Sequence, residues 1–139
     1  YETDFLAVKP DFLSILIGIN DTWRRYDSND PTSAEQFAEN YENLLMKVRA
    51  DLPQCKIMLI EPFLLNAIRA RIDWRVDLDP KIHIVRDLAR KYADYYLPMD
   101  GIFAAQPYAP AELAADGVHP TQLGHGTIAQ YWLHALGIL

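Results

Sequence analysis

Two side chains near the C-terminus have types and a spacing that could perform acid–base chemistry. Asp116 precedes His119 by three positions, just before a predicted helix. A carboxylate so placed can accept a hydrogen bond from one imidazole nitrogen and leave the other nitrogen free as a base. Such a pair is the orienting half of a catalytic triad. The same spacing is also common in loops with a purely structural role, so the pair is not specific by itself.

A second stretch places polar groups at the end of an apolar run. The run Phe12–Ile17 is followed by Gly18 and Asn20, and an apolar run of this length predicts a parallel strand buried on both faces. Ligands of open α/β sheets bind at the carboxyl ends of the strands. The Asn20 amide could therefore donate to an oxyanion, a role worth roughly 3 kcal/mol of activation free energy. The alternative is an asparagine that caps its own turn.

Strands and helices alternate along the chain that carries these two stretches. The apolar patterns predict strands at about 11–17, 56–61 and 95–98. Helices are predicted at 32–52, with Ser33 as its cap, from Asp79-Pro80 to Tyr92, and from Pro120 onward. We expect the segments 18–31 and 99–115 to be irregular, and 63–79 to be a loop or short helix. This β-α-β-α-β-α order predicts a three-layer α/β fold with a parallel sheet and right-handed crossovers.

Composition narrows the class of protein and its partners. The chain has 139 residues, half of them apolar, which predicts one domain over 1–139 with no membrane span. A net charge of −6 leaves no basic face for nucleic acid and disfavours a membrane surface. The single Cys55 excludes an internal disulfide and a CxxC metal site, which favours a reducing compartment such as the cytoplasm.

The predicted strand order leaves the first strand without a second neighbour. If the three strands pair in succession, the most apolar of them, at 11–17, lies at the edge of the sheet, an arrangement that natural proteins normally avoid. The chain also opens at Tyr1, without Met, inside an amphipathic segment over 1–8 that predicts the end of a helix. We therefore expect strands and their helices before Tyr1, or a pairing strand from another chain or from a second copy in a homo-oligomer.

Together the two polar stretches resemble the third and fifth sequence blocks of the SGNH, or GDSL, hydrolase family. The Gly-Ile-Asn-Asp sequence after the apolar strand, the Asp-Gly-Val-His-Pro sequence before the last helix, and the α/β segments between them follow that family's order. The resemblance covers the whole chain as the C-terminal two-thirds of such a domain. It implies a flavodoxin-like α/β/α fold. The family's first block, with the nucleophilic serine, and its second block, with an oxyanion-hole glycine, would precede Tyr1.

The resemblance also implies an activity and a role for each site residue. It implies a serine-dependent hydrolase of small carboxylic esters, with no metal or organic cofactor, in which Asn20 is an oxyanion donor, His119 the general base and Asp116 the residue that orients His119. The sequence shows no long apolar lid segment, which favours a small acyl group on a sugar. Ser14, expected to be buried in mid-strand, and Cys55, at the opposite end of the sheet, do not replace the nucleophile. We expect the 139 residues alone to lack covalent ester hydrolysis.

Two other functions stay open at this point. One is a non-catalytic binding or assembly domain derived from such a hydrolase. The other is a metal-dependent hydrolase that uses Asp116, His119 and His125, although a spacing of six positions does not place the two histidines on one helical face. Aromatic residues of the predicted loops could line an acyl or sugar pocket or could simply pack. We expect the arginines of the segment 63–79 to form a solvated charged face.

Overall fold

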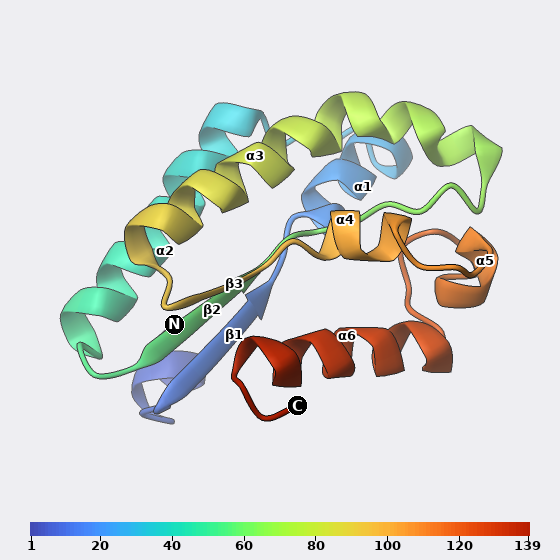
Figure 1. Ribbon diagram of the computed structural model, residues 1–139. Helices are drawn as coiled ribbons and strands as arrows, with labels where there is room; N and C mark the ends of the chain where they lie inside the picture. The colour runs from blue at the N-terminus through green and yellow to red at the C-terminus, as the bar shows by residue number, and fades with distance from the viewer.

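The computed structural model describes residues 1–139 and contains one parallel sheet of three strands. The strands β1 (Phe12–Leu16), β2 (Lys56–Ile60) and β3 (Tyr95–Leu97) lie side by side in the order β1-β2-β3 (Figure 1). The register pairs Phe12 with Lys56 and Leu16 with Ile60. The predicted strands and their parallel pairing are confirmed.

Helices cover both faces of this sheet. The helices α2 (Ala34–Asp51) and α3 (Arg75–Tyr92) lie over one face, and α6 (Gln122–Ala135) lies over the other (Figure 1). The predicted cap of α2 is present, because the Ser33 side chain accepts a hydrogen bond from the Gln36 amide at 3.1 Å. The three-layer α/β/α architecture predicted for this chain is confirmed.

The central strand divides the core into two parts. Ile57 and Leu59 of β2 belong to the cluster formed with α2 and α3, whereas Met58 and Ile60 belong to the cluster on the side of α6. Successive side chains of a strand point to opposite faces, so a continuous apolar run can serve both clusters. All four of these side chains are buried.

The edge strand β1 is much less buried than its sequence predicts. Only Ile15 is buried, and Leu16 and Ile17 are each 40% exposed. The prediction of burial on both faces was therefore wrong, whereas the predicted edge position is confirmed. Ser14 is also exposed rather than buried, and its hydroxyl accepts a hydrogen bond from Trp132 Nε1 at 3.1 Å.

The segment after β1, predicted to be irregular, forms the helix α1 (Ile19–Asp27). Its apolar residues Ile19, Trp23 and Tyr26 recur at the spacing of one helical face, but the helix is only nine residues long and mostly polar, so this pattern is weak in the sequence. The helix lies against α3 and is held there by tertiary contacts, as when Arg25 Nη1 donates to Asp77 Oδ1 at 2.9 Å. Asn20 consequently lies in the first turn of a helix and not in a loop.

Gly18 makes the sharp turn from β1 into α1 possible. Its φ is +123°, a conformation that other residues rarely adopt. A Cβ at this position would lie 3.1 Å from Pro62 and 3.2 Å from Phe37. The close packing of the turn on the loop after β2 therefore requires glycine.

The predicted start of α3 at Asp79-Pro80 was wrong. The chain first forms the 3₁₀ helix η2 (Arg69–Trp74), and α3 begins at Arg75, so Pro80 lies inside it. A proline leaves the carbonyl four residues earlier without its helical donor. That carbonyl belongs to Val76, which is 76% exposed, so water can satisfy it.

The segment 99–115 is also more regular than predicted. It contains the short helices α4 (Met99–Ala104) and α5 (Pro110–Leu113). Both bury apolar side chains in the core on the side of α6, among them Phe103 and Leu113.

The first residues form a single π-helical turn, η1 (Glu2–Leu6), where the sequence predicts the end of a helix. No helix of the structure, from η1 to α6, combines the length and the apolarity that crossing a membrane requires.

Candidate active site

The loop that carries Asp116 and His119 is pressed against the loop after β2. Gly117 has a φ of +88°, and a Cβ there would lie 2.6 Å from the carbonyl oxygen of Leu65. The carbonyl of Gly117 accepts a hydrogen bond from the Leu65 amide at 2.9 Å. Only glycine allows this approach, and the approach fixes the loop over the carboxyl end of the sheet.

Asp116 and His119 form the pair that the sequence predicts. Asp116 Oδ2 lies 2.8 Å from His119 Nδ1. The second carboxylate oxygen, Oδ1, accepts hydrogen bonds from the amides of Val118 at 3.1 Å and His119 at 2.8 Å. The carboxylate is thus fixed on its own loop and selects the tautomer with the proton on Nδ1. The His119 side chain is 74% exposed, which leaves Nε2 accessible.

Burial and hydrogen bonding act in opposite directions on the Asp116 carboxyl. Burial alone would raise its pKa, but hydrogen bonds from the His119 amide and ring, the Val118 amide and Arg71 outweigh this effect and hold the pKa well below its usual range. Asp116 is therefore an ionised acceptor at neutral pH.

Arg71 is a site residue that sequence reasoning missed. Its Nη1 donates to the main-chain oxygen of Asp116 at 2.7 Å and to Asp116 Oδ2 at 3.1 Å. Its guanidinium carbon lies 4.3 Å from the centroid of the Trp23 ring and 5.1 Å from that of Trp74. The prediction of a solvated arginine face was wrong here, because Asp116 lies 45 residues away and no local pattern marks it as a partner.

One cleft brings His119 together with α1. A volume of about 330 Å³ is lined by Asn20, Trp23, Arg24, Asp27 and His119. The four residues of α1 have the spacing i, i+3, i+4, i+7 and so share one face of the helix. The structure thus places Asn20 and His119, which are 99 positions apart in the sequence, on one cleft. The Trp23 ring centroid lies 5.6 Å from that of His119.

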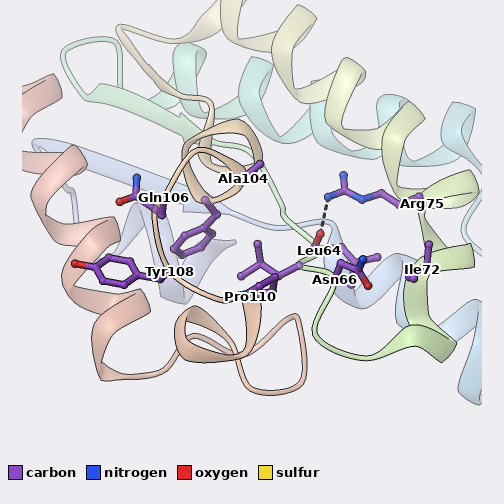
Figure 2. A pocket seen from close by; sticks show the side chains of 10 residues that line it. Leu64, Asn66, Ile72, Arg75, Ala104, Gln106, Tyr108 and Pro110 are labelled. Carbon is purple, nitrogen blue, oxygen red and sulfur yellow. Dashed lines mark hydrogen bonds between the residues drawn. The ribbon is translucent and has the colours of Figure 1, made fainter.

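A second cavity, of about 290 Å³, shares no residue with this cleft (Figure 2). Its lining is mostly apolar, and its one cation, Arg75, donates to the carbonyl of Leu64 and to Asp100 Oδ1 and Oδ2 at 2.8 and 2.7 Å. Figure 2 shows Gln106 and Tyr108 on the opposite wall. The cavity is lined by no imidazole, carboxylate or thiol, so the polar cleft is the candidate active site.

The cleft contains a base but no nucleophile of its own. None of its lining residues is a serine or a cysteine. Cys55 is buried directly before β2, at the amino end of the sheet. Nor do His119, Asp116 and His125 form a metal site, because no three acidic, histidine or cysteine side chains gather closely enough to hold an ion. These residues give no support to the metal-dependent alternative.

Comparison with known proteins decides the family. A family model described as GDSL-like lipase/acylhydrolase matches residues 1–126. This chain belongs to the GDSL-like lipase/acylhydrolase family. The resemblance seen in the two sequence motifs is thereby confirmed.

Relatives within the GDSL-like family match nearly the whole chain. An acetylxylan esterase from Geobacillus stearothermophilus is 31% identical over 141 aligned residues, which cover 99% of this chain and 64% of that protein. A crystal structure described as a GDSL-like lipase from Parabacteroides merdae superimposes with a TM-score of 0.91 at 31% identity, covering 99% of this chain and 65% of that chain. The chain therefore spans slightly less than two-thirds of the length of these relatives.

Solved variants of the acetylxylan esterase bear on the site. Three structures are described as catalytic mutants, in which a serine, an aspartate or a histidine is replaced by alanine. The aspartate and the histidine are three positions apart in that enzyme. The histidine variant superimposes on this chain with a TM-score of 0.84 at 27% identity, covering 98% of this chain and 64% of its own.

Proposed function

We propose that the protein containing this chain hydrolyses carboxylic esters and that its preferred substrates are acetylated carbohydrates. The observation that carries the proposal is the 2.8 Å contact between Asp116 Oδ2 and His119 Nδ1, which leaves Nε2 accessible on the cleft shared with Asn20. An oriented imidazole beside an amide donor is the arrangement that acyl transfer needs.

In the proposed reaction the nucleophile is a serine outside the 139 residues. His119 Nε2 takes the proton of the serine hydroxyl while its oxygen forms a bond to the acyl carbon. Asn20 donates a hydrogen bond to the carbonyl oxygen as it becomes an oxyanion. The C–O bond to the alcohol then breaks, and the imidazolium, stabilised by Asp116, gives its proton to the leaving oxygen. In the second half of the reaction, water replaces the serine as the nucleophile. His119 takes a proton from the water as it attacks the acyl carbon and then gives that proton to the departing serine oxygen.

Two features support a carbohydrate as the alcohol part of the substrate. Arg24 and Asp27 line the cleft beyond Asn20, and both are exposed. A guanidinium and a carboxylate can hydrogen bond to sugar hydroxyls, whereas a lipid tail would leave them unpaired. The acetylxylan esterase relative supports the same substrate class.

We further propose that a strand from outside the 139 residues pairs along the open edge of β1. The exposed apolar side chains of Leu16 and Ile17 and the unpaired edge of β1 support this. The coverage of the relatives supports it as well, because about one-third of their length has no counterpart in this chain. The same segment would supply the serine. A second copy of the chain is the alternative occupant of this edge.

The test compares the protein expressed from its complete reading frame with the 139-residue chain. We expect the complete protein to release acetate from acetylated xylo-oligosaccharides and to be labelled by a fluorophosphonate probe, which reacts with activated serines. The 139-residue chain should do neither. A complete protein that carries no labelled serine and releases no acetate would contradict the proposal.

The second candidate is a non-catalytic binding or assembly domain. The lack of a serine or cysteine in the cleft favours it. The intact mass of the protein isolated from its source separates the two candidates. The non-catalytic candidate requires that all of the material is either the 139-residue species or a longer species without a reactive serine. Sedimentation would then show whether two copies associate.

A further inference from the structure

We propose that Arg71 is a positioning residue, which holds the Asp116–His119 pair in its working geometry. The inference rests on the proposed function, in which that pair is the base of the reaction. Arg71 contacts Asp116 but does not line the cleft. It therefore acts through the carboxylate and not on the substrate.

The contact with Asp116 fixes both the main chain and the side chain of that residue. One guanidinium nitrogen, Nη1, donates to the main-chain oxygen at 2.7 Å and to Oδ2 at 3.1 Å. Oδ2 is the oxygen that also meets His119 Nδ1. The Val118 and His119 amides hold Oδ1, and Arg71 adds a second restraint that opposes movement of Oδ2 away from the imidazole.

Arg71 is itself held rigidly. Its guanidinium lies over the ring of Trp23 at 4.3 Å and near that of Trp74 at 5.1 Å, and these two rings pack edge to face with centroids 5.3 Å apart. The Arg71 side chain is only 21% exposed. Partial desolvation strengthens both the cation–π contacts and the ion pair.

These contacts form a continuous series that begins and ends at Arg71. Arg71 binds Asp116, Asp116 binds His119, the His119 ring lies 5.6 Å from Trp23, and Trp23 lies under Arg71. The series of contacts connects α1, η2 and the loop 116–119. Because Asn20 lies on α1 one turn before Trp23, the same contacts set the separation between the oxyanion donor and the base.

Arg75 provides a matched control within the same chain. Its guanidinium also bridges a main-chain carbonyl, that of Leu64, and a carboxylate, that of Asp100. It contacts no residue of the cleft. A general loss of a buried arginine clamp should therefore affect the Arg75 variant as much as the Arg71 variant, whereas loss of positioning should affect only the latter.

The test measures the tautomer of neutral His119 by long-range ¹H–¹⁵N NMR in the protein expressed from its complete reading frame, so the measurement does not depend on ester hydrolysis. In the unmodified chain the Nδ1–H form should predominate, because Asp116 accepts that proton. Arg71→Met keeps an unbranched apolar stem and removes the donors and the charge. We expect it to lower the ratio of the Nδ1–H to the Nε2–H form about fivefold, the equivalent of one ordinary hydrogen bond, and Arg75→Met to leave the ratio unchanged.

Each outcome decides for or against the proposal. An unchanged ratio in Arg71→Met overturns it, and so does an equal change in Arg75→Met. If Arg71→Met does not fold, Arg71→Lys replaces it, since lysine keeps the charge but lacks the planar donors. An intermediate ratio in Arg71→Lys supports positioning, and the unmodified ratio overturns it.

In the complete protein, Arg71→Met should lower kcat about tenfold with KM little changed. A tenfold loss is the lower end of what is usual when a residue that orients another functional side chain is removed. A fall in kcat/KM that comes only from KM overturns the positioning role. A complete protein without any esterase activity would instead contradict the proposed function, and the tautomer ratio would still test the Arg71 contact.

Discussion

The strands β1 and β2 are equally long, lie in register and are similarly apolar, yet they differ in burial. In β2 every residue after Lys56 is buried, whereas in β1 only Ile15 is. The strand β2 has a neighbour on each side, and β1 has β2 alone. Burial of a strand is thus decided by what lies beside it and not by its own apolarity.

The two strands also separate the scaffold of the molecule from its chemistry. Side chains of β2 hold both core clusters together. The carboxyl end of β1 leads through Gly18 into α1, whose exposed face forms the cleft with His119. Changes on the β1 side should therefore affect activity more than stability, and changes in β2 should do the reverse.

The largest effect is expected for His119→Ala in the complete protein. Removal of the proposed general base should lower kcat by about 10⁴-fold or more, the loss typical of triad members. Because the side chain is 74% exposed, the free energy of unfolding of the 139-residue chain should change by less than about 0.5 kcal/mol. Steady-state kinetics and urea unfolding measure the two effects. A loss of stability in His119→Ala as large as that of a core substitution would contradict the separation between the residues of the cleft and those that stabilise the fold.

A pair of leucine truncations sharpens the comparison directly. Leu59→Ala in β2 should lower the free energy of unfolding by about 3 kcal/mol, because the side chain is fully buried. Leu16→Ala in β1 should cost less than about 1 kcal/mol, because much of that side chain is already in water. Urea unfolding of the 139-residue chain measures both. Equal costs would mean that the edge of β1 is covered in solution, and the mass of the species in sedimentation would then identify a second copy.

The smallest effect concerns Asp94, at the amino end of the sheet. Its carboxylate accepts from Arg49 Nη2 at 2.7 Å, Lys56 Nζ at 3.0 Å and the Ile57 amide at 2.9 Å. Burial alone would raise its pKa, but these contacts outweigh burial and place the pKa well below the usual range. A pKa depressed by folding gives stability that is present above the unfolded pKa of about 3.9 and lost as the pH falls toward the folded value.

Asp94→Asn should therefore lower the free energy of unfolding by about 2 kcal/mol at pH 7 and by progressively less below about pH 4. Urea unfolding at a series of pH values measures the difference. The kinetic constants of the complete protein should not change, because Asp94 lies at the end of the sheet away from the cleft. A constant difference at all pH values would show that the ionised form contributes nothing to stability.

The sequence alone determined the strands, the helices with clear apolar periodicity, the layer architecture, the family and the Asp116–His119 pair. These features depend on contacts between residues close in the chain or on a single repeating period. The apolar stripe of α2, its Ser33 cap and the three-residue spacing of the acid and the imidazole are all of this kind.

Other features were decided only by the tertiary structure, and each depends on partners far away in the chain. The apolar stripe of α1 consists of three residues in a short polar helix, and Pro80 lies inside α3, where Val76, four residues earlier, is exposed to water. The place of Asn20 on the cleft of His119 and the clamp of Arg71 on Asp116 require the sheet to bring separate loops to one end. The exposure of β1 likewise follows from its place at the edge of the sheet, because burial depends on both surfaces in a contact, and the apolarity of a strand describes only one of them.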